Sequence, residues 1–159
     1  MAVVIGRNPK RTLIRALILA IATFVLFKFI LLPIRVTGES MMPTCRNGKV
    51  TCVNRLSYKW ANPRCGEVVA VKISTEQEVL LKRIVGLPHE TIAMENGITK
   101  IDGRSLEEPY TQPNPDWSFG ETKLGESEYL ILGDNRSMDM GSHYFTIVSR
   151  AELIGKLLF

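Results

Sequence analysis

The sequence predicts a mostly β domain of short antiparallel strands, preceded by one transmembrane helix. One long apolar run near the N-terminus, from Leu13 to Ile34, indicates the helix. Short stretches rich in Val, Ile, Leu and Tyr follow it, each bounded by Gly, Pro or Asn, and these are typical of strands. Tight-turn dipeptides between the stretches favour hairpins, in which neighbouring strands are antiparallel.

The apolar run has the length of a membrane span. As a helix it would be about 33 Å long, against a hydrocarbon core of roughly 30 Å. Its centre, residues 16–27, carries no charge, and Lys28 near the outer end can extend its ammonium toward water. A cleaved signal peptide is the alternative, but the only suitable small residues, Ala20-Ile21-Ala22, lie inside the run. We therefore predict an uncleaved anchor.

The excess positive charge lies before this anchor. The chain has a net charge of +4, and residues 1–15 alone hold Arg7, Lys10, Arg11 and Arg15 and no acid. Such an arm predicts a cytoplasmic N-terminus, a bilayer as partner and a location in the cytoplasmic (inner) membrane. No excess remains on the folded part, which argues against nucleic acid as a partner. We predict a basic arm over 1–12, a transmembrane anchor over 13–34 and an extracytoplasmic domain over 35–159.

The strand predictions come from residue type and alternation. The predicted strand stretches are 49–58, 66–74, 79–86, 97–101 and 128–133, and the predicted tight turns are Asn47-Gly48, Asn96-Gly97 and Asp102-Gly103. The Pro-rich stretch 107–121 is predicted to be a loop. The three cysteines, Cys45, Cys52 and Cys65, form no C-x-x-C, so a metal site is not expected, and whether two of them pair stays open.

Two residues could carry chemistry. Ser40 lies in "GESMMPT", a turn directly after the anchor, and Lys82 lies in the strand stretch "VLLKRIVG". An edge strand with two solvated cations, Lys82 and Arg83, is one interpretation of that stretch. In the other, burial between Leu80 and Ile84 lowers the pKa of Lys82, so that the neutral amine can take a proton from the Ser40 hydroxyl. A Ser–His–Asp triad or a Cys45 nucleophile, using His89 or His143, has less support, because no nucleophile-elbow pattern surrounds Ser40.

Several segments in order resemble the bacterial type I signal peptidases, which are membrane-bound Ser–Lys proteases. "GESMMPT" is similar to their nucleophile box and "LLKRIVGLPHE" to their general-base box. "NGITKIDGRSLEEPY" resembles their hairpin, "LGDNRSMDMGSHYF" their last box and "RAELIGKLLF" their closing strand. The resemblance implies two antiparallel β-sheets of the signal-peptidase type beside the membrane. It also implies removal of signal peptides from secreted preproteins, with Ser40 as nucleophile, Lys82 as base and no metal or other cofactor.

The resemblance further implies a substrate groove. An extended peptide would add as a strand between residues 36–38 and 80–82, with small side chains before the cleavage site. The residues it assigns to the oxyanion hole and groove are Val36, Gly38, Met41, Cys45, Leu80 and Leu81. The backbone N–H of Ser40 would bind the oxyanion. Gly38 stands where some members have a hydroxyl donor.

The last box departs from the family pattern. Its supporting residues here are Asp134, Asn135, Arg136, Asp139 and Ser142. Asp139 replaces a Ser that helps orient the lysine, and Gly141 and His143 replace the usual Asp and Arg, so that buried pair is expected to be missing in its usual form. Either Asp139 lies close to Lys82 and raises its pKa, or it points away and Ser137 or Ser142 supplies the hydroxyl. We favour the second arrangement.

Two other functions remain open on the sequence. One is a processing peptidase of the same chemistry that serves a pilin or another single substrate. The other is an inactive, membrane-anchored homologue that still binds peptides in the groove. A serine-directed covalent probe separates the last from an enzyme.

Overall fold

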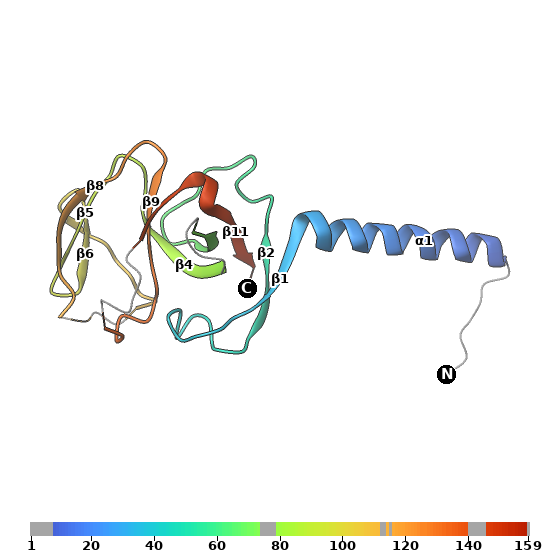
Figure 1. The fold of residues 1–159 in the computed structure, drawn as a ribbon, viewed down its shortest axis with the longest axis horizontal. Coiled ribbons are helices and arrows are strands. Elements are labelled where there is room, and N and C mark those ends of the chain that lie inside the picture. Colours follow the sequence, from blue (N-terminus) through green and yellow to red (C-terminus); the bar gives the residue numbers. More distant parts are fainter. Residues whose placement is uncertain (1–7, 74–78, 112–113, 115, 140–145, 159) are drawn as a thin grey trace.

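The computed structural model describes residues 8–73, 79–111, 114, 116–139 and 146–158. An N-terminal helix projects from a domain of two antiparallel β-sheets (Figure 1). The predicted fold class, mostly β with two antiparallel sheets behind one apolar helix, is confirmed.

The helix α1 spans Pro9–Val25 and continues as a π-helical turn, Leu26–Ile30. Its 22 residues are long and apolar enough to cross a membrane, and none of α1 is buried. Residues 31–34, predicted as part of the helix, instead begin strand β1, Leu31–Arg35. Pro33 explains the difference, because it lacks a backbone N–H and disfavours helical geometry at Leu32.

In the described residues the larger sheet has the strand order β1-β2-β11-β3-β4-β9-β10 and the smaller one β7-β6-β5-β8. The larger sheet comprises β1, β2 (Val50–Asn54), β3 (Val68–Lys72), β4 (Val79–Gly86), β9 (Glu128–Leu132), β10 (Thr146–Ser149) and β11 (Leu153–Leu158). The smaller sheet comprises β5 (Thr91–Glu95), β6 (Ile98–Ile101), β7 (Arg104–Ser105) and β8 (Phe119–Lys123). A 3-10 turn, Arg150–Glu152, precedes β11.

The core covers both faces of the larger sheet. Four consecutive residues of β3, 68–71, are buried, as expected for a strand in the middle of a covered sheet. One face packs against Val36, Met41, Cys45, Val53 and Leu157. The other packs against Ile84, Tyr129, Ile131, Val148 and Leu153. The residues before and within the Ser40 turn thus belong to the first of these clusters.

The position of strand β4 shows that the edge-strand interpretation of its sequence was wrong. It lies between β3 and β9 and is therefore not an edge strand. Lys82 is 4% exposed and Arg83 is 7% exposed, so neither is a solvated cation. The hairpin turns are as predicted: Asn96, Gly97, Asp102 and Gly103 all have positive φ. The predicted loop 107–121 was partly wrong, because β8 starts inside it at Phe119.

We expect the β domain to fold without its helix. A chain lacking residues 1–29 should keep its thermal unfolding midpoint within a few degrees, because α1 buries no side chain. Circular dichroism of the shortened and full chains in the same detergent measures this. A chain lacking residues 1–35 is the matched control, because it also loses β1 and its pairing with β2, and it should unfold at a clearly lower temperature. If the unfolding midpoint fell by the same amount in both shortened chains, the domain boundary would be contradicted.

Candidate active site

The turn that carries Ser40 is held at both ends. Val36 donates its N–H to the carbonyl of Lys49 at 2.9 Å and accepts the N–H of Gly48 at 2.8 Å, which closes a loop over the intervening residues. Gly38 has φ +90, a conformation that a side chain at this position would disfavour. Met41, which follows Ser40, is 2% exposed and anchors the turn in the core, while Ser40 itself stays half-buried.

The segment after β9 fixes the same turn from another side. The backbone N–H of Asn135 donates to the carbonyl of Ser40 at 3.0 Å. The side-chain amide of Asn135 donates to the carbonyl of Glu39 at 3.1 Å. Asn135 lies 96 positions after Glu39 and 95 positions after Ser40, so these two hydrogen bonds join segments that are far apart in the sequence. The backbone around Ser40 has little freedom to move.

Lys82 lies in an environment that favours its neutral form. It is 4% exposed and pairs with Val69 in the middle of the larger sheet. Burial lowers the pKa of Lys82 below its ordinary value, and the nearby Asp134 carboxylate acts in the opposite direction. The carboxylate that raises the pKa of Lys82 therefore lies next in sequence to Asn135, whose backbone N–H donates to the carbonyl of Ser40.

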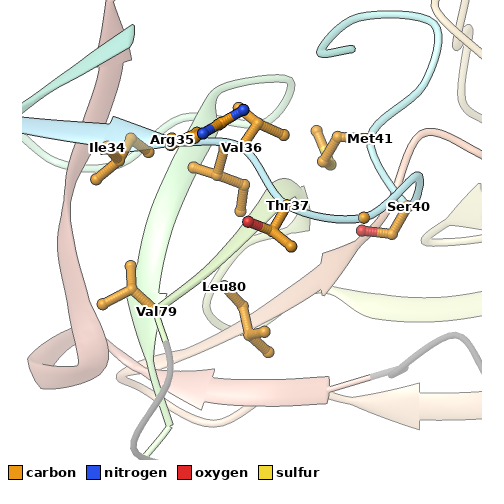
Figure 2. Close-up of a pocket in the computed structure, with 10 residues that line it drawn as sticks. Ile34, Arg35, Val36, Thr37, Ser40, Met41, Val79 and Leu80 are labelled. Atoms are coloured by element: carbon orange, nitrogen blue, oxygen red, sulfur yellow. The ribbon is translucent and has the colours of Figure 1, made fainter. Parts of the chain in front are cut away.

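A cleft of about 420 Å³ runs between the end of β1 and the start of β4. It is lined by Ile34, Arg35, Val36, Thr37, Gly38, Ser40, Met41, Val79, Leu80 and Leu81. In Figure 2 the Thr37 and Leu80 side chains lie on opposite sides of the cleft, with Ser40 at one end. The structure brings together all predicted groove residues except Cys45, which is fully buried in the core cluster behind Met41.

Both walls of the cleft are strand edges. Val36 directs its backbone groups toward Lys49 and Gly48, so by alternation Arg35 and Thr37 direct theirs toward the cleft. On the opposite wall β4 pairs with β3 from Val79 onward, but among the described residues its pairing with β9 starts only at Arg83. The first half of β4 therefore has an edge toward the cleft. An extended peptide could add hydrogen bonds to both walls.

A buried ion pair lies behind Lys82. Arg83 donates to Asp134 through Nε at 2.8 Å and Nη2 at 2.5 Å, in the two-pronged geometry that guanidinium and carboxylate favour. Thr44 Oγ1 donates to the same carboxylate at 2.5 Å, and Arg83 Nη1 reaches the Gly66 carbonyl. The guanidinium also lies 3.7 Å from the ring centroid of Tyr110. This pair was not predicted from the sequence, where its only signal is a second cation in an apolar strand stretch.

A second buried pair joins the smaller sheet to the segment after β9. Arg136 Nη2 lies 2.6 Å from Glu108 Oε1, and both side chains are nearly inaccessible. Glu108 also accepts from Thr99 Oγ1 at 2.6 Å. Arg136, predicted as a supporting residue, therefore positions the segment that carries Asp134 and Asn135 rather than facing the cleft.

We expect Arg83→Met to destabilise the fold strongly. Asp134 would remain buried as an uncompensated charge, at a cost of about 3–5 kcal/mol. The thermal unfolding midpoint of the full chain in detergent should fall by roughly 10–20 °C. The double variant Arg83→Met/Asp134→Leu is the matched control, and it should recover most of the loss because no buried charge remains. If it were as unstable as the single variant, lost packing rather than the charge would be responsible.

The remaining residues of the last box are placed only in part. Ser137 donates its hydroxyl to Asn135 Oδ1 at 2.5 Å, and Asp139 is exposed. Ser142, Gly141 and His143 lie outside the described residues. The exposure of Asp139, and the action of Asp134 on Lys82, favour the arrangement in which Asp139 points away.

We therefore expect Asp139→Asn to leave the acid limb of the pH profile unchanged. An exposed carboxylate is screened by water and has little effect on a buried amine. The measurement is kcat/KM against pH for the parent and the variant. A shift of the acid limb to lower pH in the variant would place Asp139 close to Lys82 during turnover.

The alternative nucleophile and base have unsuitable environments. Cys45 is fully buried, and burial raises the pKa of its thiol. His89 is exposed in the turn between β4 and β5, with φ +71. Cys45, Cys52 and Cys65 are all free thiols.

Comparison with known proteins points to one family. The model of the signal peptidases, peptidase S26, matches residues 10–159. A probable signal peptidase I-2 of Synechocystis sp. is 31% identical over 92% of this chain and 68% of its own length. A signal peptidase I of Leptolyngbya laminosa is 35% identical over 76% of this chain and 64% of its own length. The crystal structure of a signal peptidase I from Enterococcus faecalis matches with a TM-score of 0.52 and 27% identity, covering 62% of this chain and 98% of that one.

Proposed function

This chain belongs to the type I signal peptidases, serine endopeptidases of peptidase S26, and we propose that it removes signal peptides from secreted preproteins with a Ser40–Lys82 dyad. One observation carries the assignment of these two residues. Ser40 lies at the end of a cleft whose opposite wall, Leu80–Leu81, leads directly into the buried Lys82.

In the first step Ser40 Oγ attacks the scissile carbonyl, and the neutral Lys82 amine takes the hydroxyl proton. The oxyanion that forms is stabilised by the backbone N–H of Ser40. The intermediate then breaks its C–N bond, and the Lys82 ammonium gives its proton to the leaving amine. The mature protein leaves, and the signal peptide stays bound to Ser40 as an ester.

In the second step Lys82 takes a proton from water, which attacks the ester carbonyl. Collapse of this intermediate returns the proton to Ser40 Oγ and frees the signal peptide as a carboxylate. The lowered pKa of Lys82 supports this role, because a base must be neutral at the working pH. The hydrogen bonds of Asn135 to the carbonyls of Ser40 and Glu39 support a fixed position of the Ser40 backbone.

Substrate would bind as an added strand between the two edges of the cleft. The edges at Arg35–Thr37 and Val79–Leu81 support this, because each directs backbone groups toward the cleft. The lining residues Val36, Met41, Leu80 and Leu81 are apolar and leave room for small side chains. This arrangement fits a preference for small residues before the cleavage site.

The helical segment Pro9–Ile30 would anchor the enzyme in the cytoplasmic membrane. The basic N-terminal arm supports a cytoplasmic N-terminus and an extracytoplasmic catalytic domain. Preproteins crossing the same membrane would then reach the cleft from the bilayer side.

Cleavage of a preprotein with an Ala-x-Ala site, by the full chain in detergent, tests the proposal. We expect cleavage directly after the second Ala, identified by the N-terminal sequence of the product. A preprotein with bulky residues at both Ala positions is the control and should stay intact. Labelling by a serine-directed probe without any cleavage would leave a peptidase of different specificity, and neither labelling nor cleavage would indicate an inactive homologue.

A further inference from the structure

The walls of the cleft have an inner and an outer face. Val36 is buried in the same core cluster as Met41, and Leu81 packs against this cluster from the opposite wall. Side chains alternate along an extended chain, so Thr37 and Leu80, the neighbours of Val36 and Leu81, lie on the outer face. Thr37 is exposed and Leu80 is half-buried, which makes them the open face of the cleft.

A peptide added between the walls has the same alternation. The two small side chains of the proposed Ala-x-Ala site would lie on the inner face, against Val36 and Leu81, because this is the face that the core closes. The middle residue, x, then points outward. Thr37 and Leu80 lie on opposite sides of the cleft, with Ser40 at one end (Figure 2), so x would lie between these two side chains.

Thr37 supplies the polar group of this outer face. Besides Ser40, the cleft lining has two polar side chains, those of Arg35 and Thr37. Arg35 Nη2 lies 3.9 Å from the position that a Cβ on Gly48 would occupy, and in Figure 2 the guanidinium points away from Leu80. No hydrogen bond within the described part of the chain engages the Thr37 hydroxyl. Its proton and its lone pairs are therefore available to a ligand.

A short hydroxyl side chain at x suits this environment. Neighbouring strands lie about 4.8 Å apart, so short side chains on the same face of two strands are within hydrogen-bond reach. Pairs of Thr with Thr or Ser form such bonds between strands. Long charged side chains would extend past Thr37 into water. The methyl groups of Thr37 and Leu80 would contact the carbon atoms of x, so Thr, which has both a hydroxyl and a methyl group, fits best.

We propose that Thr37 determines the preference of the cleft at the middle position of Ala-x-Ala, and that it selects threonine or serine there through a hydrogen bond between the two hydroxyls. The proposal rests on the proposed function and refines its substrate class. Cross-strand pairs of this kind correspond to a preference of roughly two- to fivefold in kcat/KM. Substrates would thus be ranked by a residue that takes no part in the chemistry.

Two soluble peptides that differ only at x, one with Thr and one with Val, test this with the full chain in detergent. We expect the parent to cleave the Thr peptide about two- to fivefold better in kcat/KM, and Thr37→Val to show no preference because it has lost the hydroxyl. Thr122→Val is the matched control, since Thr122 lies in β8 of the other sheet, and it should keep the parental preference.

Three results would overturn the proposal. The first is a parent that cleaves both peptides equally well. The second is a preference for Thr that persists in Thr37→Val. The third is an equal loss on both peptides in Thr37→Val, which would mean that Thr37 shapes the cleft wall without recognising x.

Binding separates this proposal from the proposed function. Ser40→Ala cannot form the ester, so the affinities of the two peptides, measured by fluorescence anisotropy of a labelled N-terminus, report recognition alone. Ser40→Ala should bind the Thr peptide about two- to fivefold more tightly, and Ser40→Ala/Thr37→Val should bind both equally. If this difference were found and the parent cleaved neither peptide, the proposed function would be overturned and the role of Thr37 supported. Equal affinities for Ser40→Ala, or no binding of either peptide, would overturn the role of Thr37.

Discussion

Replacing Ser40 by alanine should reduce preprotein cleavage to background, a loss of roughly 10⁴-fold or more in kcat/KM. Without the hydroxyl no ester can form, and no water molecule is activated to attack the scissile carbonyl in its place. The fold should be unaffected, because the Ser40 side chain is half-exposed and the turn is held through backbone groups that alanine also has. We expect a change in the free energy of unfolding within about 0.5 kcal/mol.

Cleavage assays and thermal unfolding of the same preparation measure both effects. Ser105→Ala is the matched control, because Ser105 is an exposed serine of β7 in the other sheet. It should keep parental activity and parental labelling by a serine-directed probe, whereas Ser40→Ala should lose both. Substantial turnover by Ser40→Ala would exclude Ser40 as the nucleophile.

The strands predicted from alternation proved to be those with strong local signals. The hairpin turns at Asn96-Gly97 and Asp102-Gly103 were predictable because positive φ suits those residues. Strand β1 was not, because its residues continue the apolar run. Pro33 disfavours a helix there, and the pairing with β2 completes the strand. Strand β8 was not predicted, because the prolines before it indicate a loop. Its pairing with β5, rather than its own sequence, makes it a strand.

The candidate site, like the fold, could be predicted from the sequence only in part. Ser40 and Lys82 could be proposed from local motifs and from the chemistry of a neutral lysine. The ion pair of Arg83 with Asp134 could not, because the two residues are 51 positions apart and nothing local specifies their contact. In the family pattern a buried Asp–Arg pair is formed by the positions of residues 141 and 143, which lie outside the described residues. The Arg83–Asp134 pair uses a different arginine.

Lys82→Arg should be as inactive as Lys82→Met. A guanidinium stays protonated at any usable pH and cannot take the proton of Ser40. The parent should gain activity as pH rises through the pKa of Lys82, which burial places below its ordinary value. Lys72→Arg is the matched control, because Lys72 is exposed at the end of β3, and it should behave as the parent. Turnover by Lys82→Arg would mean that Lys82 supplies only positive charge.

The methionine variant should also be more stable than the parent. Because the folded-state pKa of Lys82 is lowered, the unfolded chain binds more protons between that pKa and the ordinary value near 10.5. Parental stability therefore rises with pH across this window, and the burial of Lys82 has its full cost below it. Methionine removes the ionisable group and keeps a similar length, so we expect a gain of about 1 kcal/mol at neutral pH. Thermal unfolding at several pH values measures the gain, which should shrink as pH rises through the window. A methionine variant less stable than the parent at neutral pH would mean that Lys82 is charged and paired in the folded enzyme, and the dyad would then lack its base.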